Sequence, residues 1–266
     1  MRKLLYTTVV FIGFFILFQE FIHKNKFDTE YFEQNSQEIS KNNSEITQTI
    51  EIINKRIESI KSIHVPNMPI KLKTSGLTFK LNGDLAFEKD KNFRLLIAHK
   101  LTGKEMDLGS NQNIFWFWSK RINPPALYFS KHENIYKTNL KSALNPILMI
   151  ESLNLNEIKI KNIKNTKKNE KYLVLYEDRT SPTNEPLDLA TFIDLSTNRI
   201  VTKTLLYKDG RKIVTSQYDD KKIYYEYHEE NTVMEWDLNN AKINPTLPLS
   251  CWDMPNMTKT IDIGNE

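Results

Sequence analysis

The chain has 266 residues, enough for one large domain or two small ones. Hydrophobic residues make up 39% and aromatic residues 11% of it, so the chain can bury a substantial core. The formal net charge is only +4, well below the strong positive charge of nucleic-acid-binding proteins, so we expect no nucleic-acid partner. The single cysteine, Cys251, excludes an internal disulfide and a metal site built on paired thiolates.

Residues 1–26 have the pattern of a membrane-targeting segment. Arg2 and Lys3 precede a stretch, residues 4–18, that is apolar apart from two threonines. No small-residue cleavage site and no lipobox cysteine follows. We therefore expect an uncleaved signal anchor over residues 1–26, with the rest of the chain on the extracytoplasmic side, in the periplasm or cell envelope. A cleaved signal peptide and a core helix of a cytosolic protein are the alternatives.

Residues 27–64 predict an amphipathic helix packed on the following domain. The stretch is polar and free of Gly and Pro, and its isoleucines recur at helical spacing. The isoleucines of this stripe are Ile39, Ile46, Ile50, Ile53, Ile57 and Ile60. Pro66 and Pro69 are expected to end the helix. A coiled coil is the alternative, although the repeat is short for one.

Residues 65–266 have mainly β patterns. Candidate strands lie at residues 70–81, 84–88, 93–100, 104–108, 113–119, 126–129, 172–177, 187–195, 199–207, 212–218, 222–228 and 232–238. Asn82-Gly83 and Asp209-Gly210 predict type I′ hairpins, and residues 194–199 a longer turn. This spacing predicts one large antiparallel sheet, curled into a barrel or half-barrel. The Pro-rich apolar stretch at 243–255 is expected to pack as an extended cover.

One predicted helix interrupts the strands. Residues 139–155 place Leu144, Leu148 and Leu155 at helical spacing, with Pro146 suited to the first helical position. We expect this helix to lie across the sheet.

An aromatic strand at residues 113–119 is the main candidate for a binding surface. Its Phe-Trp-Phe-Trp run is apolar on both faces, which predicts cover on both sides. We expect the face that carries Trp116 to line a lipid cavity beneath the helix at 145–155, because indole rings suit the boundary between acyl chain and headgroup. The predicted lipid-binding residues are Leu95, Ile97, Ile114, Trp116, Trp118 and Leu148. The alternative is that these side chains form ordinary core.

Catalytic motifs are weak in this sequence. Asp188 and Asp194 could pair as glycosidase carboxylates, and His228-Glu229-Glu230 could form an acid-base or metal cluster, but a polar strand end explains the second. The lysines at 159–171 could contact anionic headgroups or could belong to a solvated loop. We predict no enzymatic activity, no metal and no cofactor.

Several segments, in chain order, resemble bacterial envelope proteins of the LolA/LolB-like lipoprotein-carrier superfamily. They are Asn92–Leu95, Asp107–Asn111, Phe115–Trp118, Pro124–Tyr128, the helix Asn145–Leu155, the hairpin Ile193–Val201, Ile243–Pro245 and Trp252–Pro255. The resemblance implies an α+β, mostly antiparallel fold for residues 65–266. It would be a large open half β-barrel with an N-terminal helix and a lid helix on its concave face, here preceded by a membrane anchor helix.

The same resemblance implies a function without catalysis. Proteins of this kind bind the acyl chains of a lipid or lipoprotein, so we expect lipid binding in the cell envelope. Two departures stand out: the turn that carries a lid-clamping Arg in LolA reads Lys89-Asp90-Lys91 here, and the acylated Cys of LolB-like receptors is missing. The alternatives are an envelope sensor or interaction module with a protein partner, and a hydrolase of envelope glycans.

Overall fold

The computed structural model describes residues 36–40, 43–89, 92–138, 146–181 and 185–265. Contacts divide the chain between residues 37 and 38, and the fold below is that of residues 38–266. The anchor predicted for residues 1–26 lies outside the described residues, as does Asp90. Within the described ranges, no helix has both the length and the apolar character needed to cross a membrane.

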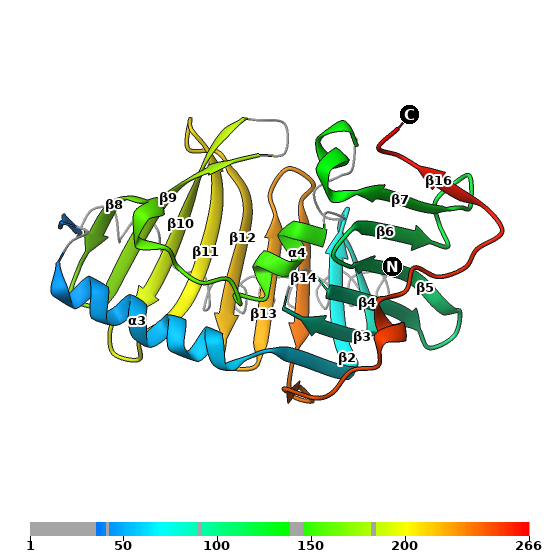
Figure 1. The fold of residues 1–266 in the computed structure, drawn as a ribbon, viewed down its shortest axis with the longest axis horizontal. Helices are drawn as coiled ribbons and strands as arrows, with labels where there is room; N and C mark the ends of the chain where they lie inside the picture. The colour runs from blue at the N-terminus through cyan, green and yellow to red at the C-terminus, as the bar shows by residue number, and fades with distance from the viewer. Residues whose placement is uncertain (1–35, 41–42, 90–91, 139–145, 182–184, 266) are drawn as a thin grey trace, which may run out of the picture. The chain divides into compact units, whose positions relative to one another are not determined.

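A single antiparallel sheet dominates the fold (Figure 1). Its strands are β1 (Gln37–Glu38), β2 (Ser62–Thr74), β3 (Leu77–Glu88), β4 (Asn92–His99), β5 (Gly103–Ser110), β6 (Ile114–Ser119), β7 (Leu127–Lys131), β8 (Ile163–Lys168), β9 (Tyr172–Thr180), β10 (Pro186–Asp194), β11 (Arg199–Tyr207), β12 (Lys212–Asp219), β13 (Lys222–Tyr227), β14 (Thr232–Asp237), β15 (Lys242–Ile243) and β16 (Thr260–Asp262). From β8 they follow in the spatial order β8 to β14, then β2 to β7, then β16.

The sheet is open, as the sequence predicted. Its order is linear, and within the described residues no pairing joins the β8 edge to the β16 edge. Strand β14 pairs with β2 and thereby joins the two halves of the meander, with Trp236 opposite Ile70. The only parallel pair described is β16 with β7. The expected α+β class with a mostly antiparallel, unclosed sheet is confirmed.

One predicted hairpin is wrong. Asn82 and Gly83 lie inside β3, where Gly83 is opposite Met68. A Cβ atom at Gly83 would come within 2.6 Å of Ile70 Cδ1, so the glycine permits close packing and makes no turn. The chain instead turns at Ser75-Gly76, where both residues have positive φ angles of 49° and 77°.

A second correction concerns the lysine-rich stretch at 159–171. We read it as a solvated loop or a headgroup-binding run, but it contains β8, which pairs with β9. Ile163 is 1% exposed and Thr166 is fully buried. The sequence pattern did not indicate a strand because lysines occupy exposed and half-buried positions of β8, which lies next to the short outermost strand β1.

Helix α3 (Ser44–Ser59) confirms the isoleucine stripe from Ile46 to Ile57. The predicted bounds of 27–64 are wrong, because Gln37–Glu38 form β1, Ile39 precedes the helix and Ile60 is its C-cap. Pro66 and Pro69 lie within β2. The Asn43 side chain accepts a hydrogen bond from the Glu45 amide at 2.9 Å and caps the first turn of α3. Its buried isoleucines are Ile46, Ile50, Ile53 and Ile57. They pack against Leu173, Leu175, Ile193 and Ile200 on strands β9–β11, the strands that α3 crosses in Figure 1.

Helix α4 (Pro146–Ser152) confirms the predicted second helix, with Pro146 first, but it ends before the predicted Leu155 because Asn154 adopts a positive φ of 58°. Met149 and the following Leu153 and Leu155 join the main core, which is built on β2–β5 and β10–β14. We call the face of the sheet that α3 and α4 cover the inner face, and the opposite one the outer face. Short 3-10 turns lie at η1 (His132–Lys137), η3 (Ile160–Asn162) and η4 (Leu249–Trp252).

Candidate functional site

The register of β4–β6 separates the residues that we predicted to line one cavity. Leu95 is opposite Leu108, and Leu108 is opposite Phe117. Together with Ile97, these side chains belong to the inner-face core that contains Met149 of α4. Leu148 is half-buried on α4 and packs against the same core. Three of the six predicted residues therefore lie on or over the inner face.

The other three predicted residues lie on the outer face. Trp116 is opposite Gly109 and Trp118 is opposite Asp107, so both indoles and Ile114 point away from α4. The expectation that the Trp116 face lies beneath the helix is wrong. Strand parity correctly grouped the residues, but it could not say which group faces the helix. The predicted cover on both sides is confirmed, because Phe115 is fully buried and Trp116 is 1% exposed.

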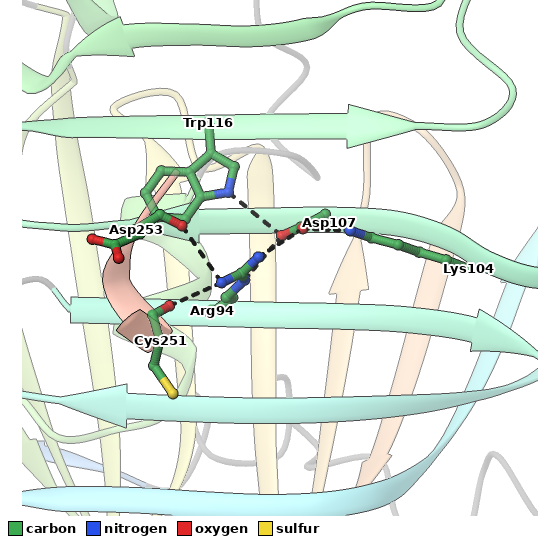
Figure 2. Close-up of polar contacts among 6 residues, drawn as sticks. All are labelled: Arg94, Lys104, Asp107, Trp116, Cys251 and Asp253. Atoms are coloured by element: carbon green, nitrogen blue, oxygen red, sulfur yellow. Dashed lines mark hydrogen bonds and ion pairs between the residues drawn. The ribbon is translucent and has the colours of Figure 1, made fainter. Parts of the chain in front are cut away.

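A polar network centred on Asp107 and Arg94 includes the ring nitrogen of Trp116 (Figure 2). Asp107 is fully buried and accepts hydrogen bonds from Trp116 Nε1 at 3.4 Å, Arg94 Nη2 at 3.1 Å and Lys104 Nζ at 2.7 Å. Arg94 also donates to the carbonyl oxygen of Cys251 at 3.2 Å. Every charged group of this network has a partner, so the network stabilises the packing of the C-terminal segment on the outer face.

The C-terminal segment covers this network, as predicted. Trp252 is 6% exposed, and its carbonyl oxygen accepts a hydrogen bond from Asn111 Nδ2 at 3.2 Å. The Trp116 ring lies so close to Gly109 that a Cβ atom there would be 2.0 Å from the ring. Trp116 is therefore held between the sheet and its cover, and no acyl chain can reach it without displacing the C-terminal segment.

The inner face carries a groove of about 570 Å³. It lies between the C-terminal half of α3, the segment after α4, strands β10–β13 and Leu238, which follows β14. Its apolar lining is Ile53, Ile57, Ile60, Leu153, Leu155, Ile200, Val201, Ile223 and Leu238. The sequence predicted α3 but not the groove, because the lining comes from five separate segments that only the tertiary fold brings together.

The charged residues at the groove mouth are mostly paired. Arg56 Nη1 donates to the carbonyl oxygen of Asn198 at 2.8 Å, and Arg199 Nη1 forms an ion pair with Asp220 at 2.9 Å. Lys222 Nζ contacts Glu235 at 2.7 Å. These contacts fix the turns at one end of the sheet and leave the floor of the groove apolar.

A second, smaller cavity of about 30 Å³ lies beneath α4. Its lining includes Glu151, Glu177, Arg179, Lys203 and Tyr225. Glu177 is 3% exposed, and burial raises its pKa. Burial of the ammonium lowers the pKa of Lys203 to about 8. We missed this cluster, although the sequence held a signal: Lys203 alternates with Val201 and Leu205 on the apolar side of β11.

The catalytic candidates do not converge. Asp188 and Asp194 lie six residues apart on β10, roughly 20 Å along the strand, well beyond the separation of about 5–9.5 Å in glycosidases. His228 Nε2 contacts Thr215 Oγ1 at 2.9 Å, whereas Glu229 accepts from the Tyr207 hydroxyl at 2.9 Å. Across the described residues, no three His, Cys, Asp or Glu side chains are grouped to hold a metal ion.

No protein-family model matches the sequence, and no curated protein matches it. Solved structures do match its fold. A LolA superfamily protein from Nitrosomonas europaea is 12% identical, covers 77% of this chain and 97% of its own, and has a TM-score of 0.50. A DUF1329 family protein from Desulfovibrio piger is 10% identical, with 79% and 98% covered and a TM-score of 0.51.

A third similar structure is a putative outer membrane lipoprotein-sorting protein domain from Vibrio parahaemolyticus. It is 12% identical, with 78% of this chain and 97% of its own covered and a TM-score of 0.50. At these identities the likeness is one of fold. The resemblance to the LolA-type fold is thus confirmed over most of the chain.

Proposed function

We propose that the domain binds the acyl chains of a lipid or lipoprotein in the inner-face groove, without catalysis. The observation that carries this proposal is the groove itself: about 570 Å³ with an apolar floor, within the roughly 300–1,000 Å³ of known ligand pockets. The LolA-type fold supports it, because the structures of this fold include a putative lipoprotein-sorting domain.

The contacts at the mouth favour binding over chemistry. Arg199 and Lys222 already have carboxylate partners, and the carboxylates Asp188 and Asp194 lie far apart on β10. A ligand in the groove would therefore meet hydrocarbon on its walls and fixed, paired charges at its mouth. That environment suits an aliphatic chain whose polar end remains near water.

The binding residues that we propose differ from those that the sequence suggested. Leu95 is fully buried and Ile97 is 5% exposed, and both are core beneath the inner face. We propose Ile57, Leu155 and Ile223 as acyl contacts, because they line the groove. Residues 1–26 would tether this domain to the membrane of the cell envelope, as their apolar stretch suggests.

Native mass spectrometry of the full chain tests the proposal. The protein is purified in digitonin, a detergent without an alkyl chain, so that detergent does not fill the groove. We expect copurified lipid and displacement of a fluorescent fatty-acid probe. Val201→Trp and Leu238→Glu, at half-buried positions of the lining, should abolish both signals. Leu101→Glu, at a side chain that is 90% exposed, is the control.

If the wild-type chain carries no lipid and binds no probe, while circular dichroism shows it folded, the acyl-binding proposal falls. The interaction module then becomes the better account of the fold.

A further inference from the structure

The small cavity beneath α4 is lined by hydrogen-bond donors that have no acceptor. Tyr225 is 2% exposed, and its hydroxyl has no hydrogen-bond partner among the described residues; the same holds for the buried Nε of Arg179. In the described part of the chain the Lys203 ammonium forms no ion pair or hydrogen bond, yet burial lowers its pKa to about 8. Buried donors in native proteins normally have partners, so two such donors in one cavity, beside the half-buried Lys203, indicate a missing acceptor.

The register of the sheet brings these donors together. Lys203 on β11 is directly opposite Ser216 on β12, and Ser216 is directly opposite Tyr225 on β13. The three side chains thus form one row across the inner face, and all three line the cavity with Arg179.

The carboxylates nearby leave these donors free. Glu177 Oε2 accepts a hydrogen bond from Arg179 Nη2 at 3.3 Å, which leaves Arg179 Nε unused. Glu151 lines the cavity from α4. The charges of Glu151 and Glu177 partly offset the effect of burial on the pKa of Lys203. The free space of about 30 Å³ holds about two water-sized groups, which matches the two oxygens of one carboxyl or ester group.

The apolar groove begins one pleat away on the same strands. Val201, Tyr218 and Ile223 line the groove, and each is two residues from a member of the Lys203 row. Two residues along a strand span roughly 7 Å. Between the two spaces lie residues 153–158, which are fastened to α3 by reciprocal hydrogen bonds of 2.9 Å between Asn54 and the backbone of Ile158.

We infer that the small cavity binds the oxygen-bearing end of an acyl chain, and that the chain runs along β11–β13 into the groove. This inference rests on the proposed function. The shared chemistry is an acceptor oxygen on a saturated chain: the carboxylate of a free fatty acid or the carbonyl of an ester- or amide-linked acyl group. Lys203 and the Tyr225 hydroxyl donate to that oxygen, and ligand passage displaces the apolar contacts of Leu153 and Leu155.

Three ligands of equal chain length test the inference on the full chain in digitonin at pH 7, by isothermal titration calorimetry. Laurate ends in a carboxylate, methyl laurate in a neutral ester carbonyl, and dodecyltrimethylammonium has no acceptor. We expect Lys203→Met to weaken laurate binding about tenfold. It should not weaken dodecyltrimethylammonium binding and should strengthen it if anything, because the repulsion between two cations is removed. Lys212→Met, at an exposed position on β12, is the matched control.

Tyr225→Phe is a second variant in which a folding defect is not expected, because the substitution removes only the hydroxyl group. It should weaken laurate and methyl laurate binding severalfold and leave the cation unaffected. A loss confined to laurate assigns a free fatty acid, and a loss for both acceptors assigns an acyl carbonyl. If the substitutions weaken the binding of all three ligands equally, or of none, the inference is wrong, but acyl binding in the groove is not contradicted. If the wild type binds no chain at all, the proposed function itself has failed.

Discussion

The polar groups around Asp107 and those around Lys203 lie on opposite faces of one sheet. Asp107 is fully buried, and each of its oxygens accepts from a donor: Trp116, Arg94 or Lys104. On the inner face, the Tyr225 hydroxyl and the Arg179 Nε have no hydrogen-bond partner in the described part of the chain, and both lie beside the half-buried Lys203. A satisfied buried network stabilises one arrangement of the chain, whereas an unsatisfied one is retained at a cost in stability. The comparison therefore separates a cluster that holds structure from one that we propose binds a ligand.

Removing the acceptor of the outer-face network should have the largest effect. Asp107→Ala leaves Arg94 and Lys104 without a counter-ion beneath the C-terminal cover. We expect it to lower the free energy of unfolding by about 3–5 kcal/mol, as when one partner of a buried ion pair is lost. Urea denaturation measures the change.

The matched control for Asp107→Ala is Asp178→Ala. Asp178 also contacts a lysine, Lys208, but its side chain is 62% exposed, so the loss of stability should be much smaller than that of Asp107→Ala. Equal effects of the two substitutions would show that the outer-face network is not what holds the cover.

The free energy of unfolding should depend on pH because of Lys203 on the inner face. The pKa of Lys203 falls from 10.5 to about 8 on folding. Between these values the unfolded chain binds the proton that the folded chain has released, so the free energy of unfolding rises with pH through the window. The rise is up to about 3 kcal/mol.

Chemical denaturation of the wild type and Lys203→Met at pH 7 and pH 10 measures this difference. The variant should be the more stable of the two at pH 7, and the gap should close toward pH 10. Subtracting the free energy of unfolding of the variant from that of the wild type at each pH cancels the contribution of other titrating groups, including the buried tyrosines. A gap that does not vary with pH would contradict a buried, unpaired ammonium.

The smallest expected effect, that of Tyr225→Phe, gives the most direct comparison of the two clusters. Tyr225→Phe removes a donor without a partner, so we expect a change of no more than about 1 kcal/mol, toward higher stability. Trp116→Phe removes a donor that Asp107 uses, and it should lower stability. Thermal melts of the two variants, each with one polar group deleted, should shift in opposite directions.

Most of the sheet could be predicted from the sequence, because its strands alternate and end at local turn signals. The strand 199–207, for instance, was placed with the same bounds that the structure has. The wrong predictions share one cause: a residue pattern that usually indicates a turn or loop was present for the sake of contacts with distant parts of the chain. Asn82-Gly83 has the composition of a turn, but Gly83 is there because Ile70 and Leu95 pack closely against it.

The candidate site was harder to predict than the fold. Period-two alternation showed that Trp116 and Trp118 share a face, and only the pairing of Leu95, Leu108 and Phe117 shows that this face is the outer one. The groove lies where α3, the segment after α4 and four strands meet, and no stretch of sequence contains it. Lys203 was visible in an apolar alternation, but its lack of a partner is a property of the tertiary structure.

The pairing of β14 with β2 has a consequence for folding kinetics. Strands β2–β7 and strands β8–β14 can each assemble from neighbours in sequence, but the seam between them joins Ile70 to Trp236. Such long-range pairing is slow, because loop-closure entropy is lost before the contact forms. The unpaired edge of β2 is therefore exposed until synthesis has passed residue 237, and the edge of β7 until β16 arrives. During that interval each edge can pair with another nascent chain, so folding of this protein depends on protection from aggregation late in its synthesis.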